Sequence, residues 1–273
     1  MKLYNFHSHT SRCGHACGED EQYIIKAIEE GFVYYGMSDH VMFPFYSQPS
    51  IRGDYDKYYL DYLSSFAYLK DKYKEQINMF LGMEAEYHPG LKTYYRNLLC
   101  NDLEYLILGQ HYYIYDDFHM TSYNNFPNSA ALYVEHLIKG MRSGLFLYVA
   151  HPDIISFFQQ SVSEEEFKNL CFEIIKVAKE LDMPLELNVS KISVALHQNK
   201  DIESALFPID FFWEKAGQEG IKVIIGLDAH DIYYVDKKMF NFALRYAKQY
   251  NLKIMEPEEI IARMREIRSK ILR

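Results

Sequence analysis

The stretch KLYNFHSH, residues 2–9, joins an apolar run of strand length to two histidines at its far end. His7 and His9 are two residues apart, so on an extended strand their side chains project from the same face. Both imidazoles can therefore reach one metal ion. The same arrangement, an apolar run followed by a residue type that binds metals, recurs along the chain, and this recurrence decides the predicted fold.

Seven apolar runs alternate with segments of helical spacing. The clearest helical segments are residues 161–182, where Ser163 and Glu166 have the spacing of a capping box, and residues 257–273, which begin at Pro257. Apolar strands separated by helices are typical of a parallel sheet covered on both faces. Seven strands favour an α/β barrel, with a doubly wound open sheet as the alternative. The runs are residues 2–6, 32–38, 77–85, 104–110, 145–150, 184–189 and 222–227.

The composition is that of a globular protein, with 49% hydrophobic and 25% charged residues in 273. No repeat or linker divides the sequence, so we expect one domain over residues 1–273. A net charge of -9 without a basic block argues against binding of a nucleic-acid backbone. No apolar run is long enough to cross a bilayer and the start does not resemble a signal peptide, so we expect a soluble, cytoplasmic protein without disulfides.

Residue types that bind metals follow six of the seven runs, and only the run in LELNVS (185–190) ends without one. A lone histidine is most often structural, and we keep that interpretation for His88, His119, His136 and His197. Repetition at successive strand ends favours a metal site, because barrel enzymes place their catalytic groups there. Glu84 has two oxygens and can bridge two ions. The strand-end residues are His7, His9, Asp39, His40, Glu84, Glu86, His111, His151, Asp228 and His230.

The motifs HSH (7–9), SDH (38–40), GMEAEY (82–87), GQH (109–111), AHPD (150–153) and GLDAHD (226–231), together with His15, resemble the PHP (polymerase and histidinol phosphatase) superfamily. Their order and spacing are similar to the histidinol-phosphatase branch. The resemblance implies a distorted (β/α)7 TIM-like barrel with three divalent metal ions, for which zinc, iron and manganese all suit the ligands. It also implies three ligand sets: His7, His9, Glu84 and Asp228; Glu84, His111 and His151; and His15, His40 and His230.

The resemblance further implies hydrolysis of histidinol phosphate to histidinol and phosphate, a step of histidine biosynthesis, by a hydroxide that bridges two ions. We expect a small phosphorylated metabolite as partner, without nucleic acid or membrane, and leave the oligomeric state open. Cys13 and Cys17 are interpreted mainly as loop packing. Asp39, Asp153 and Asp231 are interpreted as supports for ligating imidazoles, with proton transfer as the alternative role, and Arg52, Glu86 and Lys191 as substrate-binding candidates, although Glu86 suits support of the metal ligands equally well.

Two stretches depart from the pattern of that branch. An arginine is expected shortly after HPD, where this chain reads HPDIISFFQQ (151–160), and an NTSGLR-like stretch is expected where it reads NVSKISVALHQNK (188–200). Lys191 is then the candidate to replace an arginine at the phosphate. The alternatives are another PHP-type phosphoesterase or phosphodiesterase acting on a different small phosphorylated substrate, an amidohydrolase, and a non-catalytic metal-binding module.

Overall fold

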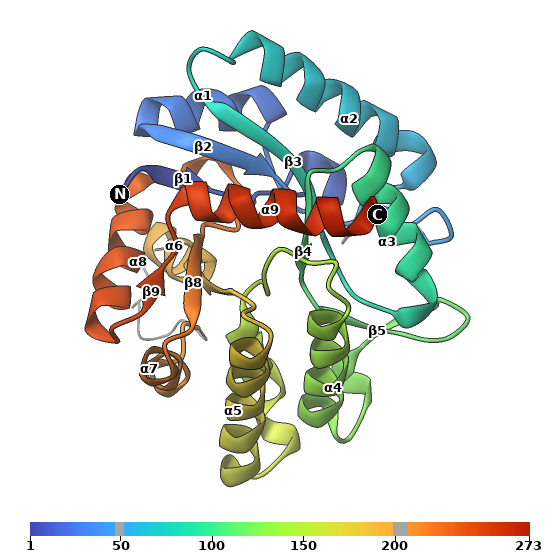
Figure 1. Cartoon of the computed structure of the whole chain (residues 1–273), viewed down its shortest axis with the longest axis vertical. Helices are drawn as coiled ribbons and strands as arrows, with labels where there is room; N and C mark the ends of the chain where they lie inside the picture. Colours follow the sequence, from blue (N-terminus) through green and yellow to red (C-terminus); the bar gives the residue numbers. More distant parts are fainter. Residues whose placement is uncertain (47–51, 199–206) are drawn as a thin grey trace.

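The computed structural model describes residues 1–46, 52–198 and 207–273. Two sets of parallel strands form the centre of the molecule, and helices surround them (Figure 1). The first set contains, in spatial order, β1 (Leu3–Asn5), β2 (Phe32–Met37), β3 (Asn78–Ala85) and β4 (Tyr105–Leu108). The second contains β7 (Leu185–Asn188), β8 (Lys222–Gly226) and β9 (Lys253–Ile254).

The fifth apolar run connects these two sets but forms no regular strand. The amide of Leu147 donates to the carbonyl of Leu106 at 2.8 Å, and the amide of Glu186 donates to the carbonyl of Val149 at 2.9 Å. Only single bridges join Val149 to its neighbours on either side. The predicted strand over residues 145–150 is therefore reduced to a short contact, because the chain turns away at His151, where φ is 27°.

The ring closes between β1 and β8. The amide of His9 donates to the carbonyl of Ala229 at 2.9 Å, and the amide of Leu227 donates to Asn5 Oδ1 at 3.0 Å. A parallel bridge also pairs Ser8 with Ala229. The fold is therefore the predicted distorted α/β barrel and not an open, doubly wound sheet.

The helices follow the strands as crossover connections. Ser163 caps the first predicted segment, since its side chain accepts from the amide of Glu166 at 3.2 Å, and Pro257 stands in the first turn of the last helix. Both predicted helices are confirmed. The α-helices are α1 (Asp20–Glu30), α2 (Tyr55–Lys72), α3 (Lys92–Asn101), α4 (Ser129–Arg142), α5 (Glu164–Glu180), α6 (Ser190–His197), α7 (Asp210–Glu219), α8 (Lys237–Gln249) and α9 (Pro257–Ile271).

Helix α9 packs at the end of the barrel where the strands begin. Lys2, before β1, forms an ion pair with Glu258, and Arg263 Nε donates to the carbonyl of Leu147 at 3.0 Å. The opposite end, where the strands stop, is left for the site. In the described part of the chain, no helix is both long and apolar enough to span a bilayer.

Buried tyrosines fill much of the space between the strands and the helices. Tyr62 OH donates to the carbonyl of Gly82 at 3.0 Å, and Tyr105 OH donates to that of Phe6 at 2.9 Å. These two hydroxyls thus have partners inside the protein, which removes most of the cost of burying them. A hairpin that was not predicted, β5 (Tyr112–Ile114) with β6 (Met120–Ser122), follows β4 and carries Tyr112 beside the site.

Candidate metal centre

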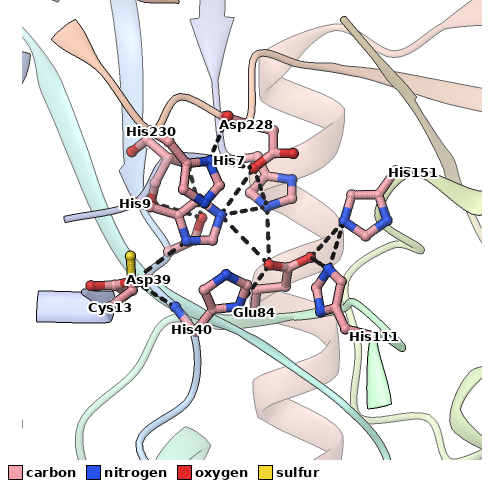
Figure 2. Close-up of polar contacts among 12 residues, drawn as sticks. His7, His9, Cys13, Asp39, His40, Glu84, His111, His151, Asp228 and His230 are labelled. Atoms are coloured by element: carbon pink, nitrogen blue, oxygen red, sulfur yellow. Dashed lines mark hydrogen bonds and ion pairs between the residues drawn. The ribbon is translucent and has the colours of Figure 1, made fainter. Parts of the chain in front are cut away.

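Imidazoles from several strand ends surround the carboxylate of Glu84 (Figure 2). Glu84 lies in β3, and the histidines that contact its carboxylate follow β1, β2, β4 and the fifth apolar run. Carboxyl ends of parallel strands meet at one end of a barrel, so residues far apart in sequence converge there. Among the described residues, five overlapping groups each bring three donor atoms within 4.8 Å of one another: His7, His9 and Asp228; His7, Glu84 and His151; His9, His40 and Glu84; His15, His40 and His230; and His9, Cys13 and His230.

His7, His9 and Asp228 form one of the three groups whose members are all buried. The two Nε2 atoms of the histidines are 3.2 Å apart. Asp228 Oδ1 lies 3.0 Å from His9 Nε2 and 3.5 Å from His7 Nε2. This geometry places three of the four ligands implied for the first ion around one point.

Glu84 directs its two oxygens toward different neighbours. Its Oε2 lies 3.4 Å from His7 Nε2 and 3.2 Å from His40 Nδ1, whereas its Oε1 lies 2.9 Å from His151 Nε2 and 3.5 Å from His111 Nε2. A carboxylate that bridges two ions has this orientation. Space for it depends on Gly109, since a Cβ at that position would overlap Glu84 Oε1.

His15, His40 and His230 form another of these groups, at the entrance of the site. The ring centre of His15 lies 4.7 Å from the ring centre of His230 and 5.3 Å from that of His40. His230 Nε2 is buried and has no hydrogen-bond partner in the described part of the chain. An orphaned buried nitrogen costs free energy, and a cation would satisfy it.

The partners of His7 and His9 decide whether this donor set fits a metal. His7 Nδ1 lies 2.7 Å from Glu186 Oε1, and His9 Nδ1 lies 3.4 Å from Asp39 Oδ1. Each Nδ1 can therefore carry the ring proton, which leaves both Nε2 atoms as lone pairs facing the oxygens of Glu84 and Asp228. Lone pairs and carboxylates this close repel one another unless a cation or protons lie between them, so the residues fit divalent metal ions.

The pKa values show the same excess of negative charge. Burial lowers the pKa of His7, but the charges of Glu186, Asp228 and Glu84 outweigh it and raise the pKa well above its usual value. Burial likewise lowers the pKa of His9, while hydrogen bonds to Asp228 and Asp39 and the nearby negative charges raise it to about 9. In the metal-free protein, therefore, the rings of His7 and His9 hold protons that offset the negative charge, as bound cations would.

Two of the candidate ligands have left-handed backbones. The φ angles are 27° at His151 and 48° at Asp228, conformations that cost energy for residues other than glycine. Neighbouring side chains hold both positions: the amide of His151 donates to Glu186 Oε2 at 2.9 Å, and Ser190 Oγ donates to Asp228 Oδ2 at 3.2 Å. Such strain is typical of functional sites.

The three aspartates proposed as supports or proton donors occupy different environments. Asp39 is buried beside His9 and also accepts from the amide of His40 at 2.8 Å. Asp153 is buried and accepts from Trp213 Nε1 at 2.9 Å, so its carboxylate anchors α7. Asp231 accepts from the amide of Tyr233 at 3.0 Å and caps a short 3-10 helix at the rim of the site. Only Asp39 has the contact expected of a support.

Two of the three substrate-binding candidates pair with each other. Arg52 Nη2 lies 2.8 Å from Glu86 Oε1, and both side chains are buried. Glu86 Oε1 also lies 3.5 Å from His111 Nδ1, so the pair stands behind a candidate ligand and not in the cavity. The burial of this pair was not evident from sequence, because the two residues are 34 positions apart and only the barrel brings them together.

Lys191 is the candidate that does line a cavity. A cavity of about 220 Å³, here called the metal cavity, opens over the donor groups, and a side lobe of about 350 Å³ adjoins it. Both share His15, Lys191, Asp228 and His230. The rest of the metal cavity is lined by His40, Glu84, His111, Tyr112, His151, Ile154, Phe157 and Phe207, and the rest of the side lobe by Cys17, Ser190, Val194, Asp231 and Tyr234.

Glu186 is a residue of the site that the strand-end pattern missed. It lies inside β7, in the run described above as ending without a ligand type, and it contacts both His7 and the amide of His151. The only signal was a glutamate within an otherwise apolar strand. Cys13 is fully buried and takes part in a donor group with His9 and His230, so it lies closer to the centre than a loop-packing role implies.

The remaining histidines lie outside these donor groups. His88 Nδ1 accepts from the amide of Gly90 at 3.2 Å, and His136 Nδ1 lies 3.1 Å from Tyr123 OH. His119 is exposed beside Asp117, and His197 packs against the rings of two tyrosines. These contacts are structural ones.

The model of the PHP domain matches residues 5–190, so this chain belongs to the PHP domain family. A protein of Deinococcus radiodurans named "Probable histidinol-phosphatase" is 24% identical over 235 residues, which cover 84% of this chain and 86% of that protein. A protein of Schizosaccharomyces pombe with the same name is 29% identical over 185 residues, 60% of each chain.

The fold is also found among solved structures. Histidinol phosphate phosphatase from Lactococcus lactis, crystallised with zinc, L-histidinol and phosphate, superimposes with a TM-score of 0.67 at 14% identity, covering 93% of this chain and 95% of that one. The chain is therefore histidinol-phosphatase-like in sequence and in fold, as its motifs predict.

Proposed function

We propose that this protein is a metal-dependent phosphatase of small phosphomonoesters and that histidinol phosphate is its substrate. The observation that carries the proposal is the cluster of imidazole lone pairs around Glu84 and Asp228, with the two Nε2 atoms of His7 and His9 only 3.2 Å apart. The names of the two relatives and the ligands of the Lactococcus lactis protein support the choice of substrate.

Charge explains how an acidic protein could accept a phosphate. Three divalent ions would bring six positive charges to a site whose implied ligands include two carboxylates, Glu84 and Asp228. When bound, such ions lower the pKa of water and neutralise the charge that develops on a transferred phosphoryl group. The remaining positive charge would attract the phosphate dianion despite the net charge of the chain.

The residues of the chain have separate tasks in this proposal. Glu186 and Asp39 orient His7 and His9 through their Nδ1 atoms. Lys191, at the boundary of the metal cavity and the side lobe, contacts the phosphate. Asp231 is the one of the three candidate aspartates that lines either space, so it is our candidate to give a proton to the departing oxygen.

The test combines metal analysis with phosphate release from histidinol phosphate. Wild type is compared with His9→Ala and Glu84→Ala, and His119→Ala serves as the control because His119 is exposed and lies outside the donor groups. We expect both site variants to lose bound metal and activity together, while the control keeps both. Full metal content and rate in either site variant would contradict the ligand assignment.

The same assay separates the alternatives. Release of phosphate from other small phosphomonoesters but not from histidinol phosphate would keep the reaction and change the substrate. Cleavage of small phosphodiesters alone would identify a phosphodiesterase, and cleavage of amides alone an amidohydrolase. Full metal content without turnover of any of these compounds would identify a non-catalytic metal-binding module.

A further inference from the structure

A separate cavity lies behind the hairpin that follows β4. Helix α4 and the hairpin of β5 and β6 lie side by side (Figure 1), and a cavity of about 130 Å³ lies between them. It shares no lining residue with the metal cavity or the side lobe. Its imidazole and charged lining groups come from His88, His136, Lys139 and Asp116. The volume equals that of about four water molecules in the liquid, so the cavity suits a ligand of a few atoms.

The structural contact of His88 uses one ring nitrogen and leaves the other for this cavity. The amide of Gly90 donates to His88 Nδ1 at 3.2 Å. A ring nitrogen that accepts from a backbone amide carries no proton of its own, so the proton of His88 is on Nε2. His88 Nε2 is therefore a hydrogen-bond donor, and it lies 3.4 Å from Asp116 Oδ1.

The proton of His136 is placed by a chain of hydrogen bonds. Gln110 Oε1 accepts from the amide of Tyr87 at 2.9 Å, so Gln110 Nε2 is the atom that donates to Tyr123 OH at 3.0 Å. The hydroxyl proton of Tyr123 is then left to donate to His136 Nδ1 at 3.1 Å. Burial, with a smaller contribution from the charge of Lys139, lowers the pKa of His136 to about 4. At pH 7 the ring is therefore neutral and carries its proton on Nε2.

These tautomers decide which kind of ligand the cavity can bind. A metal ion needs a lone pair on the ligating nitrogen, and neither Nε2 atom has one. An anion instead accepts hydrogen bonds from N–H groups and gains from a nearby positive charge. Lys139 supplies that charge. Its Nζ lies 2.6 Å from Glu135 Oε1, but both side chains are about half exposed, and such a pair is weak enough for the ammonium to exchange its partner.

We propose that this cavity binds a small oxyanion of the size of phosphate or sulfate, held by the Nε2–H groups of His88 and His136 and by the ammonium of Lys139. Asp116 is the lining carboxylate that opposes an anion, and its side chain is fully exposed, so it can turn into solvent. The site does not depend on the proposed phosphatase reaction. Inorganic phosphate, the product of that reaction, is nevertheless one anion of the right size.

Nitrogen NMR of the zinc-loaded protein, with isotopically labelled histidine rings, tests the site directly. His88→Gln and His136→Gln assign the two signals. Without added anion, both rings should show a protonated Nε2 and an unprotonated Nδ1. Titration with inorganic phosphate should then shift both Nε2 signals with one common dissociation constant, and sulfate should do the same. Sodium chloride at equal ionic strength should shift neither.

Two substitutions of exposed side chains separate an anion site from a cation site. Lys139→Met should weaken phosphate binding at these rings about tenfold, because it removes a charged donor. Asp116→Asn should strengthen the binding about two- to fivefold, because it removes the opposing carboxylate. Lys168→Met is the matched control: it breaks a pair with Glu164 of the same spacing and the same 2.6 Å length on α5, and should leave the affinity unchanged.

Three results would overturn the anion site. The first is a proton on Nδ1 of either ring, and the second is an absence of shifts in a large excess of phosphate and of sulfate. The third is a shift caused by added zinc and abolished by Asp116→Asn, which would identify a cation site. The signals of His88 and His136 do not report on turnover, so a failure of the phosphatase assay would leave this result standing, and the reverse holds as well.

Discussion

Glu186 contacts two candidate metal ligands at once, through His7 Nδ1 at 2.7 Å and through the backbone amide of His151 at 2.9 Å. One buried carboxylate thus fixes the ring of a ligand on one strand and the strained backbone of another. Gly226 makes room for it, because a Cβ there would overlap Glu186 Oε1. The position of both imidazoles depends on this contact.

Glu186→Gln is expected to weaken metal binding about 10- to 100-fold, because a neutral amide polarises the imidazole less and can present its NH2 group to Nδ1. Metal affinity is measured by competition with a chelator, and activity in the same samples. Glu180→Gln, at the exposed end of α5, is the control and should bind metal normally. A Glu186→Gln protein with normal affinity would show that the contact does not orient His7.

Metal binding should strengthen as the pH rises. His9 has a pKa of about 9 in the metal-free protein, so its ring is protonated at neutral pH and must lose that proton before a metal binds. The pKa of His7 is also raised, which adds a second proton. Between pH 6 and 8 we expect the apparent affinity for manganese to rise about tenfold per pH unit for each proton released.

Calorimetry in two buffers of different ionisation enthalpy checks this prediction directly, because the difference in heat gives the number of protons released. The released protons should number at least one at pH 7. An apparent affinity that is constant over this pH range, with no proton release, would mean that neither ring is a ligand.

The sequence predicted the convergence of the strand-end residues because their position follows from a local rule. A residue that ends a parallel barrel strand lies at the same end of the barrel as every other such residue, whatever its place in the chain. His7, Glu84 and Asp228 could therefore be assigned to one region. Their division among three ions came from the family resemblance, since spacing along the chain does not determine which side chains face one another.

Features set by long-range packing were not predicted. The sequence made Arg52 and Glu86 candidates for substrate binding, whereas in the barrel the two side chains are buried against each other. Glu186 was missed because it lies in the middle of its apolar run and not at its end. The run over residues 145–150 has the composition of a strand, but the turn at His151 limits its pairing to single bridges.

The buried ion pair leads to a prediction about stability. Burial raises the pKa of Glu86, and the charge of Arg52 is the largest of the effects that hold it below its usual value. Arg52→Met removes that charge and leaves the buried carboxylate with the imidazole of His111 beside it. We expect the free energy of unfolding to fall by about 3 to 5 kcal/mol. The double variant Arg52→Met with Glu86→Gln should recover part of this loss, as measured by urea unfolding.

Lys168→Met is the control, because it breaks an exposed pair with Glu164 and should cost less than about 1 kcal/mol. The alternative, in which Arg52 binds substrate, makes the opposite prediction. Full stability of Arg52→Met combined with a raised KM would restore that role.

Lys191 should act on the phosphate and not on the leaving group. It is exposed at the start of α6 and lines both the metal cavity and the side lobe, so its ammonium can reach an anion bound between them. Lys191→Ala is expected to lower kcat/KM by about 10- to 100-fold, the cost of one hydrogen bond to a charged group. Since every ester carries the same phosphate, the factor should be equal for histidinol, benzyl and propyl phosphate, and inhibition by inorganic phosphate should weaken by a similar factor.

Lys191→Arg should keep most of the rate, and Lys176→Ala, which removes an exposed lysine of α5, should keep all of it. A loss confined to histidinol and benzyl phosphate, whose leaving groups carry a ring, would instead show that Lys191 acts on the leaving group, on the side where its Nζ lies 6.0 Å from the ring of Phe207.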